Sequence, residues 1–80
     1  MKVSTAKIKF QCGFFDTATI IPAFNDNGWN LLLSANKTAI IIQRQRGGDA
    51  VYMSIDSAYY AAYSIGFRRV IINNNNNVKD

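Results

Sequence analysis

Hydrophobic and polar side chains alternate along much of the first half of the chain, and this two-residue period predicts β-strands. The first alternating segment covers residues 7–12. Its polar members are Lys7, Lys9 and Gln11, and its apolar members are Ile8, Phe10 and Cys12. We therefore expect a half-buried strand here, with Cys12 buried as a small apolar residue. Gly13 interrupts the pattern, which is typical of a bulge or bend.

Four further segments have the composition of strands. Residues 17–21 are rich in Thr and Ile and should end at Pro22, which cannot donate a ladder hydrogen bond. The other three are residues 29–33, residues 38–46 with three consecutive isoleucines, and the short segment 51–53. Turn-forming sequences separate these segments, at residues 25–28 (Asn-Asp-Asn-Gly), 34–37 and 47–49.

The hydrophobic period changes to that of a helix after residue 54. Ser54 is suited to N-cap the helix, and Asp56 falls in the first turn, where the helix dipole favours a negative charge. Gly66 stands where a left-handed C-cap is expected. The apolar face comprises Ile55, Ala58, Tyr59, Ala62 and Ile65. We expect a helix over residues 55–65 and a last strand over residues 67–72.

These elements predict an α+β domain: a mostly antiparallel sheet of five or six strands with one amphipathic helix packed on one face, in the order β-β-β-β-β-α-β. We expect residues 1–72 to form the single domain and residues 73–80, which are rich in asparagine, to form a flexible C-terminal tail. Residues 40–42 are apolar on both sides of their strand, so part of the second sheet face should be covered by the N-terminal segment or by another subunit.

The composition leaves few residues that could catalyse a reaction or bind a metal ion. The 80 residues include no histidine and no glutamate, one cysteine and five aspartates. Histidine is the usual general base near neutral pH and the commonest metal ligand. We therefore expect a protein that is not an enzyme and that holds neither a metal nor a cofactor. A single cysteine, no signal-peptide pattern and no apolar run of ~20 residues favour a soluble, cytoplasmic protein.

Basic residues provide the first candidate site. The formal net charge is +4, which favours anionic partners. If the basic side chains converge on the sheet, they form a stripe that contacts nucleic-acid phosphates while Tyr52 stacks on a base. The candidate residues are Lys7, Lys9, Arg44, Arg46, Tyr52, Arg68 and Arg69. The alternative is that charges on edge strands simply prevent aggregation.

Tyrosines provide the second candidate site. On the predicted helix Tyr60 points outward and Tyr63 lies on the flank. Tyrosine is enriched at protein interfaces because it combines a large contact area with a polar tip. The two residues therefore form a candidate interface, for a homodimer or for another protein. The alternative is that both are ordinary surface residues packed along the helix.

Four segments together resemble the ParC-like partition-associated proteins of plasmids. They are a Gly-Trp strand (residues 28–31), an Arg-Gly turn (46–48), a Ser-x-Asp helix start (52–58) and a Gly-Phe before the last strand (65–70). The similarity spans residues 28–72. The helix of this chain is rich in tyrosine where such proteins are richer in Leu and Arg. The resemblance implies an accessory protein of a mobile genetic element, and orphan proteins of integron cassettes are equally similar.

Together these observations predict a non-enzymatic accessory protein of a mobile genetic element. It would bind nucleic acid or regulate a partner protein as a small oligomer, most simply a homodimer, without contacting a membrane. The alternative is a protein-interaction module, such as an inhibitor of a host system, that acts through its exposed tyrosines and a sheet edge.

Overall fold

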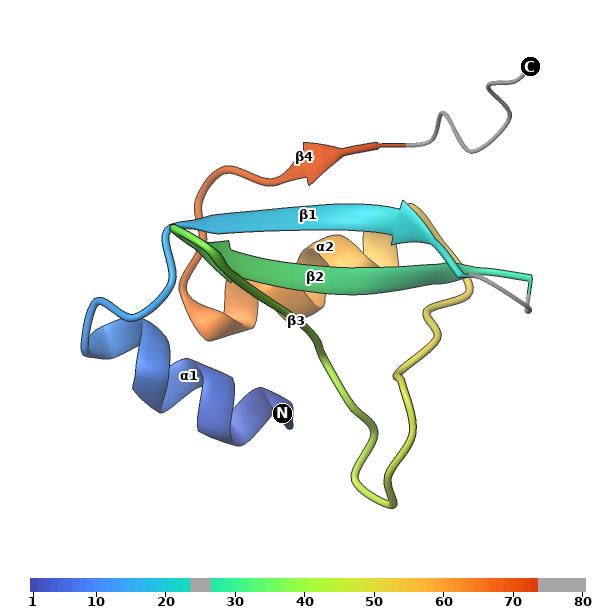
Figure 1. The fold of residues 1–80 in the computed structure, drawn as a ribbon. Coiled ribbons are helices and arrows are strands. Elements are labelled where there is room, and N and C mark those ends of the chain that lie inside the picture. The colour runs from blue at the N-terminus through green and yellow to red at the C-terminus, as the bar shows by residue number, and fades with distance from the viewer. Residues whose placement is uncertain (24–26, 74–80) are drawn as a thin grey trace.

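The computed structural model describes residues 1–23 and 27–73, and Figure 1 shows its fold. The elements are α1 (Val3–Gln11), β1 (Thr17–Pro22), β2 (Trp29–Ala35), β3 (Thr38–Ile41), α2 (Ile55–Ile65) and β4 (Ile71–Ile72). The class is α+β, as the sequence predicts. The predicted turn at residues 25–28 and the predicted tail at residues 73–80 lie largely outside the described residues.

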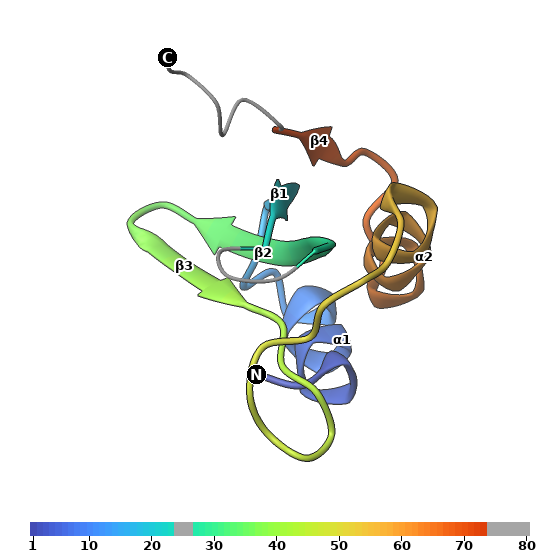
Figure 2. The same ribbon diagram turned by 90° about the vertical axis from the view of Figure 1, so that its right-hand side faces the viewer.

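The strands form one mixed sheet in the order β3-β2-β1-β4. The pairs β1/β2 and β2/β3 are antiparallel, with Ile20 opposite Leu31 and Leu33 opposite Ile40. β4 runs parallel to β1. The crossover connection from β3 to β4 contains α2 and returns the chain to the edge of the sheet beside β1. Both helices lie on the same side of the sheet (Figure 2), so the fold has two layers.

The expected sheet of five or six mostly antiparallel strands with one helix is wrong. The segment predicted as a strand over residues 38–46 leaves the sheet after Ile41, and residues 51–53 contribute only an isolated bridge between Tyr52 and Trp29. The predicted last strand shrinks to Ile71–Ile72, because the side chain of Phe67 is buried in the core instead of lying along the sheet.

The segment predicted as the first strand is the helix α1. Val3, Ala6 and Phe10 recur at i, i+3 and i+7, and they pack on the core while Lys7 and Ile8 are exposed. The alternation of lysines with apolar residues is therefore not a burial pattern. Cys12, at the C-cap of α1, is exposed, so the prediction of a buried cysteine is wrong as well.

The helix α2 has the predicted bounds and the predicted ends. The backbone N–H of Ser57 donates to the hydroxyl of Ser54 over 3.1 Å, which makes Ser54 the N-cap. Gly66 has φ +139°, a value that favours glycine, and ends the helix. Ala58, Ala62 and Ile65 are buried on the side of α2 that faces the sheet, whereas Tyr59, which was predicted on the same apolar face, is exposed.

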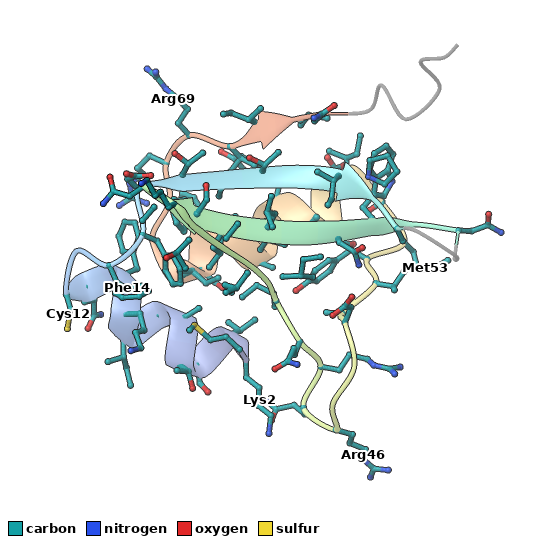
Figure 3. The ribbon with its side chains drawn as sticks, viewed as in Figure 1. Lys2, Cys12, Phe14, Arg46, Met53 and Arg69 are labelled. Atoms are coloured by element: carbon teal, nitrogen blue, oxygen red, sulfur yellow. The ribbon has the colours of Figure 1, made fainter. Side chains whose placement is uncertain are left out.

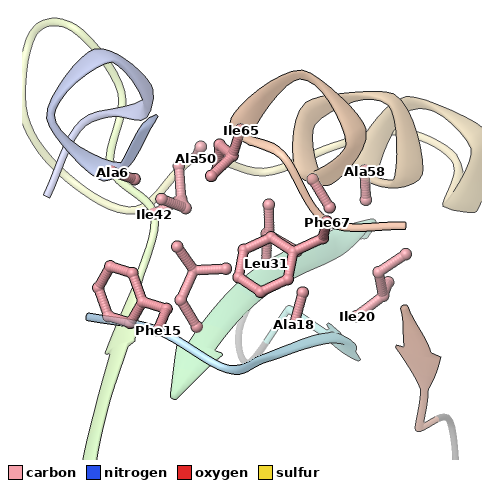
Figure 4. Packing of buried hydrophobic residues seen from close by; sticks show 12 residues of the cluster. Ala6, Phe15, Ala18, Ile20, Leu31, Ile42, Ala50, Ala58, Ile65 and Phe67 are labelled. Atoms are coloured by element: carbon pink, nitrogen blue, oxygen red, sulfur yellow. The ribbon is translucent and has the colours of Figure 1, made fainter. Parts of the chain in front are cut away.

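Alternate residues of β1 and β2 meet α2 in a single hydrophobic core, shown in Figure 4. Its largest fully buried side chains are Ile20, Leu31, Leu33, Ile42 and Ile65. Burial of each such side chain contributes about 1.5–3 kcal/mol. One core cluster of this extent is what a domain of this length requires.

Among the described residues neither helix covers the second face of the sheet, and the expected cover from the N-terminal segment is wrong. α1 lies beside α2, on the face that α2 already covers (Figure 2). The residues that alternate with the core positions are uncharged. They include Thr17, Thr19 and Ile21 of β1, Leu32 and Ser34 of β2, and Ala39 and Ile41 of β3.

The predicted turn after β2 is confirmed as a two-residue hairpin. Asn36 has φ +54°, which asparagine tolerates better than most residues, and Lys37 completes the connection to Thr38. The hairpin pairs Ala35 with Thr38 and so fixes the register of β2 against β3.

Candidate interaction surfaces

One basic surface is the turn that follows β3, residues 43–49, here named the basic loop. The backbone N–H of Arg44 donates to the carbonyl of Gly48 over 2.9 Å, and the backbone N–H of Gly47 donates to the carbonyl of Arg44 over 3.1 Å. Positive φ angles at Gly47 and Gly48 allow this tight return, which confirms the turn predicted there. The loop projects beyond the layers of the fold (Figure 1).

The N-terminal segment adds a third cation to this region. The backbone N–H of Gln43 donates to the carbonyl of Met1 over 2.8 Å, and Lys2 forms a parallel bridge with Gln43. Figure 3 shows Lys2 beside the basic loop and Arg46 at its outer end. Arg44, by contrast, folds back, and its Nε donates to the carbonyl of Gly47 over 3.3 Å. Lys2, Arg44 and Arg46 thus surround one projecting turn.

The remaining cations of the predicted stripe do not join this group. Lys7 and Lys9 lie on a helix, where residues two apart face different sides, and the Nζ of Lys9 lies 4.9 Å from the centre of the Phe14 ring. Figure 3 places Arg69 at the end of the molecule opposite Arg46. A continuous stripe that includes Arg46 and Arg69 is therefore not present.

Tyr52 lies in the sheet layer and packs against the core. Its backbone exchanges two hydrogen bonds of 2.8 Å with Trp29. Its side chain is half-buried, and this desolvation raises the pKa of the Tyr52 hydroxyl above its ordinary value. Its ring consequently offers less open area for base stacking than the tyrosines of α2.

Aromatic side chains cover the outer side of α2. Tyr60 is 70% exposed, as the sequence predicts, and Tyr63 is 48% exposed. The rings of Tyr59 and Tyr63 stack, with centroids 6.4 Å apart and planes 22° apart. The guanidinium carbon of Arg68 lies 5.0 Å from the centre of the Tyr63 ring. Such cation–π contacts are worth about 0.5–1 kcal/mol at exposed sites.

These residues form one continuous surface. Asp56, Tyr59, Tyr60 and Tyr63 stand at i, i+3, i+4 and i+7, which places them on one side of α2. Arg68 joins them through its contact with Tyr63. We name Asp56, Tyr59, Tyr60, Tyr63 and Arg68 the tyrosine surface. It carries an acid at the N-terminal end of the helix and a cation at the C-terminal end.

The sequence does not indicate the role of Lys2, because the helical course of residues 3–11 brings it to the basic loop. Arg68 is among the predicted cations, but its contact with Tyr63 does not follow from the strand predicted over residues 67–72. One signal for it was present: Gly66 reverses the chain directly after α2 and returns Arg68 toward the helix.

The described residues contain no group of three or more His, Cys, Asp or Glu side chains that could hold a metal ion. The one thiol, Cys12, is exposed. Within the same part of the chain, no helix has both the length and the apolar character needed to cross a bilayer.

Comparisons with protein-family models, with curated proteins and with solved structures find no match to this chain. The similarity to ParC-like proteins therefore stays a prediction from the sequence. The arguments for function depend on the surfaces described above.

Proposed function

We propose that the protein is a non-enzymatic accessory protein that contacts nucleic-acid phosphates through the basic loop. The observation that carries this proposal is the placement of Lys2, Arg44 and Arg46 around one turn that projects from the fold. A projecting turn with cationic side chains can reach a phosphate backbone without rearrangement of the core.

The internal contacts of the basic loop support this role. The hydrogen bonds between Arg44 and residues 47–48 fix the backbone of the turn, so less conformational entropy is lost on binding. Arginine provides a planar, permanently charged donor that suits phosphate oxygens. Arg46, exposed at the outer end, is the residue that would contact phosphate first.

The wider setting of the proposal comes from the sequence. The resemblance of residues 28–72 to ParC-like proteins favours an accessory role on a plasmid or another mobile element. A cytoplasmic location agrees with a single cysteine, because the cytosol keeps thiols reduced.

A salt series with purified protein tests the proposal. Fluorescently labelled double-stranded DNA and single-stranded RNA are titrated with the chain from 20 to 300 mM salt, a range spanning about one log unit. If two or three phosphates are contacted, the logarithm of the affinity should fall by roughly 1.4–2.7 per log unit of salt. Arg46→Ala should lower both the affinity at low salt and this slope.

Lys37→Ala is the matched control. Lys37 is also an exposed cation in a turn, but it lies in the β2–β3 hairpin away from the basic loop. Its removal changes the net charge as much as Arg46→Ala does. Equal effects of the two substitutions, or no retention of either nucleic acid at 20 mM salt, would contradict the proposal.

A second candidate function is a protein-interaction module, and the tyrosine surface favours it. Tyr60 and Tyr63 expose about half or more of their surface on a helix whose other outward residues are mostly small. Exposed aromatic groups of this extent mark contact sites between proteins more often than contact sites with phosphates.

A further inference from the structure

We propose that the tyrosine surface binds a second copy of this chain, with the two α2 helices antiparallel across a two-fold axis near Tyr60. This inference does not depend on nucleic-acid binding, because the basic loop and the tyrosine surface share no residue. It assigns the exposed tyrosines to the assembly of the protein.

The charges of the tyrosine surface are self-complementary. Asp56 lies in the first turn of α2, and Arg68 lies over Tyr63 near the other end. A two-fold axis perpendicular to the helix reverses the helix direction in the second copy. The acid of each copy then faces the cation of the other copy.

The geometry of α2 determines where along the helix the two-fold axis lies. With a rise of about 1.5 Å per residue, Asp56 stands roughly 6 Å from the level of Tyr60, and Tyr63 stands roughly 4.5 Å from it on the other side. Because Arg68 lies against the Tyr63 ring, an axis at Tyr60 brings its guanidinium close to the level of Asp56 in the second copy. The same axis places the two Tyr60 rings together at the centre of the contact.

The exposed area indicates a weak dimer. Tyr59, Tyr60 and Tyr63 are 38%, 70% and 48% exposed, so their rings offer roughly 300 Å² of each copy. A standard interface buries about 800 Å² of each partner. The tyrosines provide its centre and the Asp56–Arg68 pairs provide part of its rim. We expect a reversible dimer with a dissociation constant above about 1 µM.

The pattern of charge elsewhere is compatible with this contact. The chain has a net charge of +4, so two copies repel each other in most orientations. The basic loop lies at the end of the molecule opposite Arg69 (Figure 3). An antiparallel contact through α2 opposes each cation of the tyrosine surface with an acid.

Sedimentation equilibrium of the purified chain at 5–500 µM and 150 mM salt tests the proposal. The wild type should show a monomer–dimer equilibrium. Tyr60→Ala should weaken the dimer at least tenfold. Asp56→Arg and Arg68→Asp should each weaken it about tenfold, because each places like charges opposite one another. The double variant Asp56→Arg/Arg68→Asp should restore the affinity to within about threefold of the wild type.

Two controls make the result specific. Arg69→Asp changes the charge by the same amount next to Arg68 but outside the tyrosine surface, and Ile8→Ala shortens an exposed apolar residue of α1. Both should leave the dimer within about twofold of the wild type. Circular dichroism and urea midpoints of every variant separate loss of folding from loss of contact.

Three outcomes would overturn the proposal. The first is a wild-type chain that stays monomeric at 500 µM, in which case the surface serves another partner or none. The second is a dimer that Tyr60→Ala leaves unchanged. The third is a folded double variant Asp56→Arg/Arg68→Asp in which the losses of dimer affinity from the two single substitutions add. Asp56 of one copy would then not face Arg68 of the other.

Discussion

Phe10 of α1 and Phe67, just after α2, pack with their ring centroids 4.6 Å apart and their planes at 59°. This contact joins the two helices at the point where the chain turns from α2 toward β4. Gly66 lies directly beneath it, and a Cβ atom added at Gly66 would overlap the Phe10 ring. The position therefore needs glycine both for its positive φ angle and for the space that the ring occupies.

Gly66→Ala should lower the free energy of unfolding by about 2–4 kcal/mol, since backbone strain and overlap with Phe10 add. Urea denaturation measures the loss. Gly13→Ala is the control, because Gly13 also has a positive φ of +79° but has no atom within 4 Å of an added Cβ. Its cost should be only about 1–2 kcal/mol. Equal losses would show that the Phe10 contact does not constrain the helix end.

Asn30→Ala should destabilise the fold by about 1–3 kcal/mol. Asn30 is 5% exposed, and its Nδ2 donates to the backbone carbonyl of Ala50 over 2.9 Å. The bond ties β2 to the segment between the basic loop and α2, and its removal leaves a carbonyl without that donor. Thermal and urea unfolding both report the loss.

Ser64→Ala is the comparison for Asn30→Ala. The Ser64 hydroxyl donates to the carbonyl of Ala61 on the exposed side of α2. Because water can replace that bond, the change should be within about 0.5 kcal/mol. If Asn30→Ala is equally mild, water must reach the Ala50 carbonyl.

The N-cap of α2 should contribute measurably to stability. Ser54→Ala removes the acceptor for the Ser57 N–H and should cost about 1 kcal/mol. Ser54→Asp should retain most of the stability, because aspartate also caps helices and its charge suits the helix N-terminus. Urea midpoints of the two variants at neutral pH check this order. A reversed order would show that the contact between the hydroxyls of Ser54 and Ser57 matters more than the cap.

Alkaline pH should destabilise the protein partly through Tyr52. Burial raises the pKa of Tyr52 in the folded state above its unfolded value. Folding thus favours the neutral form of the hydroxyl. The resulting contribution to the free energy of unfolding is fully present below pH 10 and is lost as pH rises through the folded-state pKa. In Tyr52→Phe, the decline of the urea midpoint between pH 9 and pH 11 should be shallower than in the wild type.

Tyr60→Phe serves as the reference for that experiment, because it removes a hydroxyl from the most exposed tyrosine. Its urea midpoint is measured at the same pH values as those of Tyr52→Phe and the wild type. A Tyr52→Phe profile that follows the wild type would mean that the Tyr52 hydroxyl stays hydrated in the fold.

Sequence reasoning succeeded where several local signals agree. For α2, the Ser54 cap, the helical spacing of Ala58, Ala62 and Ile65, and the terminal Gly66 all indicate the same element. The hairpin at Asn36 was predictable for the same reason, because its turn depends only on neighbouring residues. The first helix was predicted as a strand because its lysines alternate with apolar residues. The packing of Ala6 in the core and the contact of Phe10 with Phe67 show which face of α1 is buried.

The candidate sites were predictable to a similar extent. The outward position of Tyr60 follows from helix periodicity alone. The distribution of the cations cannot be predicted from periodicity, because it depends on where α1 and the basic loop lie in space. The parallel pairing of Ile71 with Thr19 was also beyond reach, because it joins distant segments through a crossover.

That parallel pairing bears on how the chain is made. One side of β1 is completed by Ile71 and Ile72, which leave the ribosome long after β1 itself. During synthesis the nascent chain therefore presents an open row of backbone donors and acceptors at Thr19 and Ile20. Until residues 71 and 72 have been synthesised, this edge of β1 has no parallel neighbour, and pairing with another chain at that edge is most favoured during this stage.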